Sequence, residues 1–142
     1  MDRIDRILSA PPFNLDGAGC DWVRSTLAGM DRAAKVRQLF VHICFGTGPE
    51  VVERITALAP AGITKFFGPD AEAELDTLDA MRAAATVPYL VSADLEGSRM
   101  SLPFGTEVPN PLALAAVDDV QASGTIARIM ADEGEAVSEP EL

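Results

Sequence analysis

The 142-residue sequence predicts an α/β fold in which three strands alternate with helices. Three apolar runs rich in β-branched and aromatic residues begin near residues 39, 63 and 89, and each is followed by a helical pattern. The spacing of 24 and then 26 residues is a quasi-repeat of one strand–helix unit. About 30 residues per unit are expected when a (β/α)₈ barrel of roughly 250 residues is divided by eight. The pattern therefore predicts either a small open α/β sheet or the first three units of such a barrel.

The overall composition excludes several classes of protein. Hydrophobic residues make up 48% of the sequence and charged residues 23%, which is typical of a globular domain. The formal net charge is −11, and the basic residues are scattered rather than gathered into a stripe. We therefore expect no nucleic acid and no anionic membrane surface among the partners. No long apolar segment follows the charged amino terminus, which predicts no signal peptide, no transmembrane helix and a cytoplasmic location.

Cysteine and histidine residues are too few and too scattered to suggest metal chemistry. Cys20 and Cys44 belong to no Cys-x-x-Cys motif, so we expect no metal ion and no cofactor. Cys44 lies in an apolar run and is predicted to be an inert buried thiol. His42, the only histidine, stands in the same run, where a core imidazole is a better interpretation than a catalytic base.

Short helices are expected before the first strand. Apolar residues at helical spacing predict a helix over residues 1–8. Asp21 is the expected N-cap of a second helix that runs to about residue 28, and Asp31 is the expected N-cap of a third. In this third helix, Val36 and Leu39 are expected to face the interior.

The first two strand–helix units follow these helices. Residues 39–45 form the first predicted strand, and Thr47 with Glu50 three residues later predicts a capping box at the start of its helix. Residues 63–67 form the second predicted strand, and a helix follows it. The acidic residues in the first turns of that helix are attributed to a favourable interaction with the helix dipole; they are Asp70, Glu72, Glu74 and Asp76.

The third strand is predicted over residues 89–94 and, lacking a polar side, is expected to be buried on both faces. A loop of about fifteen residues follows it, and a long loop at the carboxyl end of a strand suggests function. A short helix precedes the last helix, which Asp118 and Gln121 are expected to cap. The predicted divisions of the chain are residues 1–29 as a helical lead-in, 30–137 as the α/β domain and 138–142 as a disordered tail.

Asp94 is the candidate binding residue because it stands where the third strand ends. Ligands of parallel α/β folds bind at the carboxyl ends of the strands. A carboxylate in that place can accept hydrogen bonds from two neighbouring sugar hydroxyls. Glu96 is assigned a supporting role, paired with Arg99 or with another base. The competing interpretation is that Asp94 caps a loop and that Glu96 is solvated.

Several segments, taken in order, carry the pattern of a known family. They are Met30-Asp31-x-x-x-Lys35-Val36-x-Gln38-Leu39-Phe40, Ala61-Gly62-Ile63, Asp94-Leu95-Glu96-Gly97-Ser98-Arg99-Met100, Val108-Pro109-Asn110-Pro111-Leu112-Ala113-Leu114-Ala115-Ala116 and Met130-Ala131-x-Glu133. Together they resemble the N-terminal (β/α)₈ domain of family 3 glycoside hydrolases, the β-glucosidase and β-N-acetylhexosaminidase family. The resemblance covers about residues 30–137, and the third segment is similar to the family's Asp-x-Glu-Gly-Gly-x-Val signature.

The resemblance implies the first three βα units of a (β/α)₈ barrel, preceded by short helices. It also implies a retaining glycosidase that acts on β-glucosides or β-N-acetylglucosaminides, with a small carbohydrate or β-glycoside as ligand. By matching position, Asp94 would bind hydroxyls of the sugar beside the scissile bond. Two residues depart from the family pattern: Ser98 stands where a second Gly is usual, and Leu102 stands where many members have an Arg.

The family's catalytic nucleophile and acid/base come from later segments, so no residue of this chain is assigned to them. We therefore expect the isolated chain to be inactive and to look like a truncated member. Three strands from a barrel would expose two unpaired edges and an apolar face, which predicts self-association or a complementary fragment.

Two other functions stay open. One is a non-catalytic carbohydrate-binding or interaction remnant of such an enzyme, in which Asp94 still holds a sugar. The other is a small nucleotide-binding domain, because Gly46-Thr47-Gly48 before a helix resembles a phosphate-binding loop. The full Gly-x-Gly-x-x-Gly spacing is missing from this loop, since residue 51 is Val, and this makes the nucleotide interpretation the weaker one.

Overall fold

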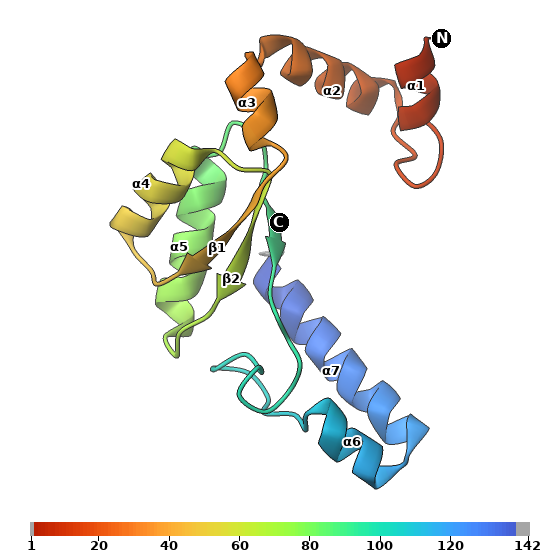
Figure 1. The fold of residues 1–142 in the computed structure, drawn as a ribbon, viewed down its shortest axis with the longest axis vertical. Coiled ribbons are helices and arrows are strands. Elements are labelled where there is room, and N and C mark those ends of the chain that lie inside the picture. The colour runs from red at the N-terminus through yellow and green to blue at the C-terminus, as the bar shows by residue number, and fades with distance from the viewer. Residues whose placement is uncertain (1, 139–142) are drawn as a thin grey trace.

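Three parallel strands form the sheet on which the chain is built (Figure 1). The computed structural model describes residues 2–138. The strands are β1 (Val41–Phe45), β2 (Gly62–Phe66) and β3 (Leu90–Ser92), arranged in the order β1-β2-β3. The α/β class and the three strand positions are therefore confirmed, although β1 and β3 are shorter than predicted and β2 begins and ends one residue earlier.

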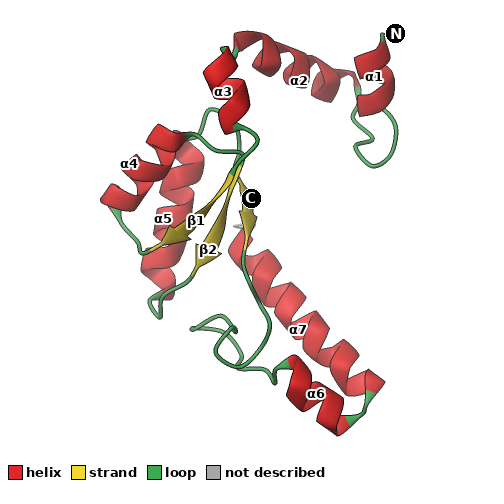
Figure 2. Cartoon of the chain, viewed as in Figure 1, coloured by secondary structure: helices red, strands yellow, loops and turns green. Residues whose placement is uncertain are grey.

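Helices precede, connect and follow these strands (Figure 2). Two of them, α4 and α5, lie side by side and cover one face of the sheet (Figure 1). The last helix ends close to β3, where Val137 joins the core. The helices are α1 (Arg3–Leu8), α2 (Gly17–Gly29), α3 (Arg32–Arg37), α4 (Pro49–Leu58), α5 (Ala71–Ala84), α6 (Pro111–Val117) and α7 (Val120–Ser138).

The hydrophobic core lies between the covered face of the sheet and helices α4 and α5. Side chains alternate between the two faces of a strand, so every second residue of β1 and β2 points toward these helices. Cys44 and Ile63 are completely buried there. Amphipathic spacing in the helices supplies the opposite side of the core; the buried helical residues are Val51, Ile55, Leu78 and Met81.

The other face of the sheet is open. Val41, Ile43 and Phe45 on β1 are more than half exposed, and Leu90 on β3 is 70% exposed. The prediction that the third strand is buried on both faces is therefore wrong for the described residues, because no helix layer covers this side. The inward orientation predicted for Val36 and Leu39 is also wrong, since their exposed fractions are 47% and 80%.

The structure confirms one of the predicted N-cap residues and contradicts two others. The Asp31 carboxylate accepts a hydrogen bond from the Ala34 amide, as predicted for the cap of α3. The second helix begins one turn earlier than predicted, with Asp16 as its N-cap in place of Asp21. The last helix is capped by Asp119, whose carboxylate accepts from the amide of Gln121, because Asp118 ends α6 in a left-handed conformation.

The capping box predicted from Thr47 and Glu50 is not formed. Gly48 is the N-cap residue of α4, with φ of 89°, and no side chain caps this helix end. A residue with a side chain is strained at such a φ, so glycine at position 48 decides where the helix starts. Pro49 occupies the first helical turn, as predicted.

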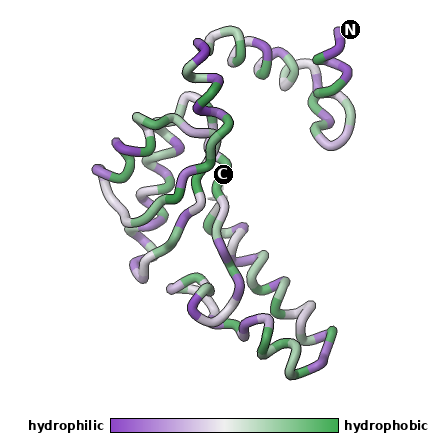
Figure 3. Tube along the Cα trace, in the orientation of Figure 1, coloured by the Kyte–Doolittle hydropathy of each residue, from purple (hydrophilic) through white to green (hydrophobic). Residues whose placement is uncertain are grey.

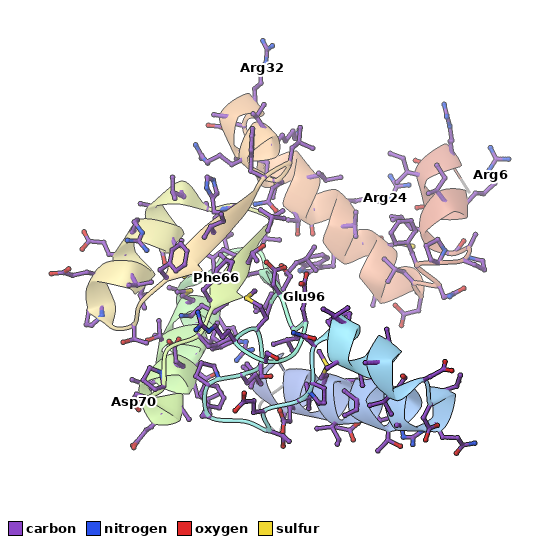
Figure 4. All side chains as sticks on the ribbon, turned by 60° about the horizontal axis from the view of Figure 1, so that its bottom comes forward. Arg6, Arg24, Arg32, Phe66, Asp70 and Glu96 are labelled. Carbon is purple, nitrogen blue, oxygen red and sulfur yellow. The ribbon has the colours of Figure 1, made fainter. Side chains whose placement is uncertain are left out.

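Helices α1 and α2 form an arm that extends away from the sheet (Figure 1). Arg24 of α2 joins the two helices, because its guanidinium lies 2.6 Å from Asp2 and 2.5 Å from Asp5. Hydrophobic and hydrophilic residues are mixed along the arm (Figure 3), and Trp22 is half exposed. Arg6 points away from the rest of the chain (Figure 4).

The carboxyl-terminal end of the described chain is helical. Ser138, the first residue of the predicted disordered tail, is still part of α7. The remaining residues of that predicted tail, 139–142, lie outside the described residues. Across residues 2–138, no helix combines the length and the apolar character that a membrane crossing requires.

The close approach of β2 to β3 leads to a first prediction. A Cβ atom on Gly62 would lie 2.4 Å from the carbonyl oxygen of Leu90, so Gly62→Ala must push the strands apart. We expect the free energy of unfolding in urea to fall by about 1–3 kcal/mol. Gly124→Ala is the matched control, because nothing lies within 4 Å of that position and helix propensity favours alanine by about 0.5–1 kcal/mol. Equal stability of the two variants would contradict the assigned strand pairing.

A second prediction concerns pH. Hydrogen bonding to Arg24 lowers the pKa of Asp2 from 3.8 to about 2. A carboxyl group whose pKa is lower in the folded chain stabilises the fold above its unfolded pKa and ceases to do so as the pH falls through the folded value. The contact between α1 and α2 should therefore persist above about pH 4 and loosen toward pH 2.

The carboxyl ¹³C chemical shift of Asp2 measures this pKa directly. Arg24→Gln should return the midpoint toward 3.8, whereas Ser25→Ala on the same helix should leave it near 2. A midpoint unaffected by the loss of Arg24 would show that the contact across the arm does not exist in solution.

Candidate functional site

Asp94 lies two residues beyond the end of β3, at the carboxyl edge of the sheet, and its side chain is exposed. It lines a small cavity of about 70 Å³ together with Phe66 of β2 and with Arg99 from the loop after β3. Figure 4 labels Phe66, the Asp70 cap of α5 and Glu96 on that loop. The predicted position of Asp94 at a strand's carboxyl end is thus what the structure shows, and its role as a ligand-binding residue stays a prediction.

The pairing of the strands ends just before Asp94. Phe45 pairs with Phe66 at the ends of β1 and β2, and Thr64 pairs with Ser92, the last residue of β3. Asp94 follows two residues later, beyond the paired residues, and its relation to the sheet is the cavity that it shares with Phe66.

The loop after β3 is held in a compact shape by its own backbone. The Ser98 amide donates to the Val108 carbonyl over 2.6 Å, and the Glu96 amide donates to the Met100 carbonyl over 3.1 Å. Gly97 has a φ of 84°, and a Cβ atom there would lie 2.3 Å from the carbonyl oxygen of Pro109. Only glycine fits at this position, which explains the Gly that follows Glu96 in the signature.

The two departures from the family pattern have different structural consequences. Ser98 adopts a φ of 49°, the left-handed region that glycine enters without steric cost, so the serine here keeps a glycine-like backbone. Leu102 is 5% exposed and belongs to the hydrophobic core. A buried leucine supplies packing where an arginine would supply a charge, and this position therefore contributes no cation to the site.

The supporting roles of Glu96 and Arg99 stay a prediction. Both side chains are exposed. Among the described residues, the ion pairs do not include one between Glu96 and Arg99. Arg99 lies beside the same cavity as Asp94, which places a positive charge near the candidate binding carboxylate.

A buried ion pair that the sequence did not reveal lies beneath the site. Lys65 of β2 and Glu74 of α5 are each 1% exposed, and the Lys65 Nζ atom lies 2.5 Å from Glu74 Oε2. Lys65 Nζ also donates to the carbonyl oxygens of Gly46 and Phe66, over 3.0 and 3.3 Å. Glu74 Oε1 accepts a 2.6 Å hydrogen bond from the amide of Gly68. The pair thus connects the loops that follow β1 and β2.

The attribution of Glu74 to the helix dipole is therefore wrong, because this carboxylate is buried and holds a lysine. The sequence does carry a signal for this lysine: Lys65 lies two residues after the core residue Ile63, so it belongs to the face of β2 that contacts the helices. A buried lysine requires a partner, and the next helix carries acidic residues at several positions. Sequence alone does not say which of these acids turns inward.

The glycine loop after β1 is occupied by a protein side chain. The amide of Gly48 donates to Thr77 Oγ1 over 2.9 Å, and the same hydroxyl donates to the carbonyl of Ala73 over 2.6 Å. A phosphate bound by this loop would compete with Thr77 for the amide. The geometry therefore disfavours the nucleotide-binding interpretation.

Cys44 and His42 were also considered in the sequence as possible reactive groups. Cys44 is fully buried, and burial raises the pKa of its thiol, so the predicted inert core thiol is confirmed. His42 is half-buried and stacks on Phe40 with ring centroids 6.3 Å apart. Within residues 2–138, no three His, Cys, Asp or Glu side chains gather closely enough to hold a metal ion.

A larger hollow than the cavity beside Asp94 lies elsewhere. A groove of about 850 Å³ runs between α4 and α5, and small residues such as Ala73 and Ala80 line it. None of its lining residues is shared with the cavity beside Asp94. Its lining is mostly apolar and does not include Asp94, so we do not assign the site to it.

Comparison with known proteins tests the family resemblance. No family model matches the chain. Over 126 residues the chain is 37% identical to a β-N-acetylglucosaminidase/β-glucosidase of Cellulomonas fimi, a match that covers 84% of this chain and 22% of that protein. This chain is a relative of the β-glucosidases and β-N-acetylglucosaminidases. The resemblance read from the sequence is thereby confirmed.

Solved structures agree with this relationship. The fold is similar to that of the β-glucoside phosphorylase BglX bound to 2FGlc, with a TM-score of 0.77 and 26% identity over 94% of this chain. A second structure of the β-glucoside phosphorylase BglX gives a TM-score of 0.75, also at 26% identity. The chain spans 24% and 23% of the lengths of these two chains, so it corresponds to a small part of its relatives.

The buried ion pair leads to a third prediction. Lys65→Met leaves the Glu74 carboxylate buried without its cation, and we expect the free energy of unfolding to fall by about 3–5 kcal/mol. The double variant Lys65→Met with Glu74→Leu should recover most of that loss, because it removes both charges from the interior.

Asp79→Asn is the control for this experiment. It breaks the exposed pair between Asp79 and Arg82, and it should change the free energy of unfolding by less than about 1 kcal/mol. If Lys65→Met were no more destabilising than Asp79→Asn, the burial of the Lys65–Glu74 pair would be refuted.

Proposed function

We propose that this chain forms part of a glycosidase that hydrolyses β-glucosides or β-N-acetylglucosaminides, with Asp94 as a sugar-binding residue. The observation that carries the proposal is the exposed carboxylate of Asp94 at the carboxyl edge of a parallel sheet, within a region related to such enzymes. Because the match covers 84% of the chain, it includes the segment around residue 94.

The three βα units are proposed to be the first three of a (β/α)₈ barrel of the glycoside hydrolase family 3 type. Parallel strands in sequential order, with α4 and α5 connecting them on the same face of the sheet, support this arrangement. The proposed divisions are residues 1–29 as a lead-in and 30–137 as the barrel part, with a short tail after them. A cytoplasmic location also stays a prediction.

Asp94 would act by hydrogen bonding rather than by covalent chemistry. An ionised carboxylate has two acceptor oxygens, which suit the donors of two neighbouring hydroxyls on a sugar ring. Hydrogen bonds to a charged acceptor are the stronger kind, so a single carboxylate can fix the orientation of a sugar. Retaining hydrolysis needs a nucleophile and an acid/base as well, and we assign neither role to a residue of this chain.

The open face of the sheet supports a proposal about partners. Exposed apolar side chains on β1 and β3 and the unpaired edges of both strands favour association with further polypeptide. We propose that the part of this face formed by Val41, Ile43 and Leu90 is covered by further strands of a barrel or by self-association. Size-exclusion chromatography with light scattering would separate a monomer from a self-associated form.

The fourth prediction tests Asp94. The wild-type chain should bind methyl β-D-glucoside or N-acetylglucosamine, observed as concentration-dependent ¹H–¹⁵N shift changes around residues 94–100. Asp94→Asn preserves the shape of the side chain and removes its charge, so we expect binding to weaken about 10- to 100-fold. Asp21→Asn, an exposed acid on α2, should bind as the wild type does.

Other outcomes would select other functions. Sugar binding without turnover of 4-nitrophenyl β-glycosides would favour the non-catalytic carbohydrate-binding interpretation for the chain by itself. Turnover that Asp94→Asn abolishes would overturn the expected inactivity of the isolated chain. Shifts at residues 46–48 on addition of a nucleotide, with none on addition of sugars, would replace the proposal by the nucleotide-binding one.

A further inference from the structure

Two aromatic side chains end the open face of the sheet at the same edge as Asp94. Phe45 is the last residue of β1 and Phe66 the last residue of β2, and the two residues are paired in the parallel register. Their rings stack, with centroids 4.8 Å apart and an angle of 24° between the ring planes. Phe45 remains 59% exposed in spite of this stacking, so the pair presents aromatic surface at the end of the sheet.

The aromatic pair is continuous with the candidate binding residue. Phe66 lines the cavity that contains Asp94 and also a larger cavity of about 470 Å³ that contains Phe45. Phe45 and Phe66 are partners in the register of β1 and β2, whereas Asp94 follows the end of β3 and lies beside the same cavity as Phe66. Two hydroxyls lie two residues before Phe66 and Asp94, since Thr64 Oγ1 and Ser92 Oγ are hydrogen-bonded at 3.0 Å.

A carboxylate beside an aromatic surface is complementary to the surface of a sugar ring. A pyranose has hydroxyls around its edge, whereas its two faces carry C–H groups wherever the ring substituents are equatorial. The face of an aromatic ring is electronegative and attracts the weakly positive hydrogens of such C–H groups. A carboxylate beside an aromatic surface can therefore hold the hydroxyl edge of the ring while the aromatic surface packs against its C–H face.

The larger cavity is also of suitable size and composition. Ligand sites for small molecules have volumes of about 300–1,000 Å³, with apolar and aromatic walls and a few polar groups. Phe45, Phe66 and Asp70 line this cavity, and Asp94 lines the smaller cavity that shares Phe66 with it.

We propose that Phe45 and Phe66 form a stacking platform for the pyranose ring whose hydroxyls Asp94 binds, and that they favour sugars with equatorial substituents. This inference rests on the proposed function, because it names the part of the sugar that a second group of residues recognises. The platform selects glucosides and N-acetylglucosaminides over mannosides, since the axial hydroxyl of mannose replaces a C–H group on one ring face.

The experiment measures binding of methyl β-D-glucoside to the full chain by ¹H–¹⁵N titration and by saturation-transfer difference NMR. Phe45→Leu and Phe66→Leu keep an apolar side chain of similar bulk but remove the aromatic face, so the fold should be preserved. We expect each to weaken binding at least tenfold and to reduce saturation transfer to the ring C–H protons. Phe66→Trp should retain binding, because it restores an aromatic face.

Phe40→Leu is the matched control. Phe40 is 52% exposed but precedes the amino end of β1, away from the strand ends that carry Asp94, so this variant should bind as the wild type does. Methyl α-D-mannoside should bind more weakly than methyl α-D-glucoside to the wild type, and the Phe66→Leu variant should lose this preference.

The results separate this inference from the proposed function. If both leucine variants bind as tightly as the wild type while Asp94→Asn does not, the platform is refuted and Asp94 keeps its role. If the wild type binds none of the sugars, the proposed function fails, and the platform fails with it. Loss of binding in Phe40→Leu as well would show a general effect on the fold and would also refute the platform.

Discussion

The contact between Lys65 and Glu74 is the interaction on which the carboxyl edge of the sheet depends. The two charged groups lie in the interior, 2.5 Å apart, and each makes further hydrogen bonds to the backbone of a loop. Removing two charges from water is costly, so a buried pair of this kind needs hydrogen bonds from other groups as well as its ion contact. The carbonyl of Gly46 and the amide of Gly68 supply them to Lys65 Nζ and Glu74 Oε1, which connects the loops after β1 and β2, whereas Glu74 Oε2 has the ion contact with Lys65 alone.

The two faces of the sheet differ in what covers them. The covered face packs against α4 and α5 and contains the core together with the ion pair. The open face carries apolar residues in β1, and Asp94 lies beyond the end of β3 at the carboxyl edge of the sheet. An exposed apolar face of this kind is unusual in a chain that stands alone, and it agrees with a region that corresponds to less than a quarter of its structural relatives.

The relatives differ in the name of the reaction but share the ligand class. The curated relative is named a β-N-acetylglucosaminidase/β-glucosidase, and the structural relatives are named β-glucoside phosphorylases. The two reactions use different acceptors for the sugar, water in one and phosphate in the other. Recognition of the sugar itself is common to both, and this is the task to which residues at the strand ends of this chain are suited.

Local sequence patterns determined the α/β class, the positions of the three strands and the family relationship. They did so because strand alternation, helix spacing and the Asp94-Leu95-Glu96-Gly97 signature depend on neighbours along the chain. The N-cap at Asp31 could be predicted for the same reason. The sequence could not decide between Asp16 and Asp21, or between Asp118 and Asp119, as the cap of a helix. Aspartates at either position have the same intrinsic capping ability, and packing selects one of them.

Only the tertiary structure decided which side chains lie inside and which meet at the edge. Glu74 is one of several acids on α5, and only the packing of that helix on β2 turns it toward Lys65. Likewise, the pairing of Phe45 with Phe66 depends on the register of two strands that are separated by a whole helix, and only the folded chain places Asp94 at the same cavity as Phe66. Burial and cross-strand register are long-range properties, so the sequence could name the candidate carboxylate but not the residues that surround it.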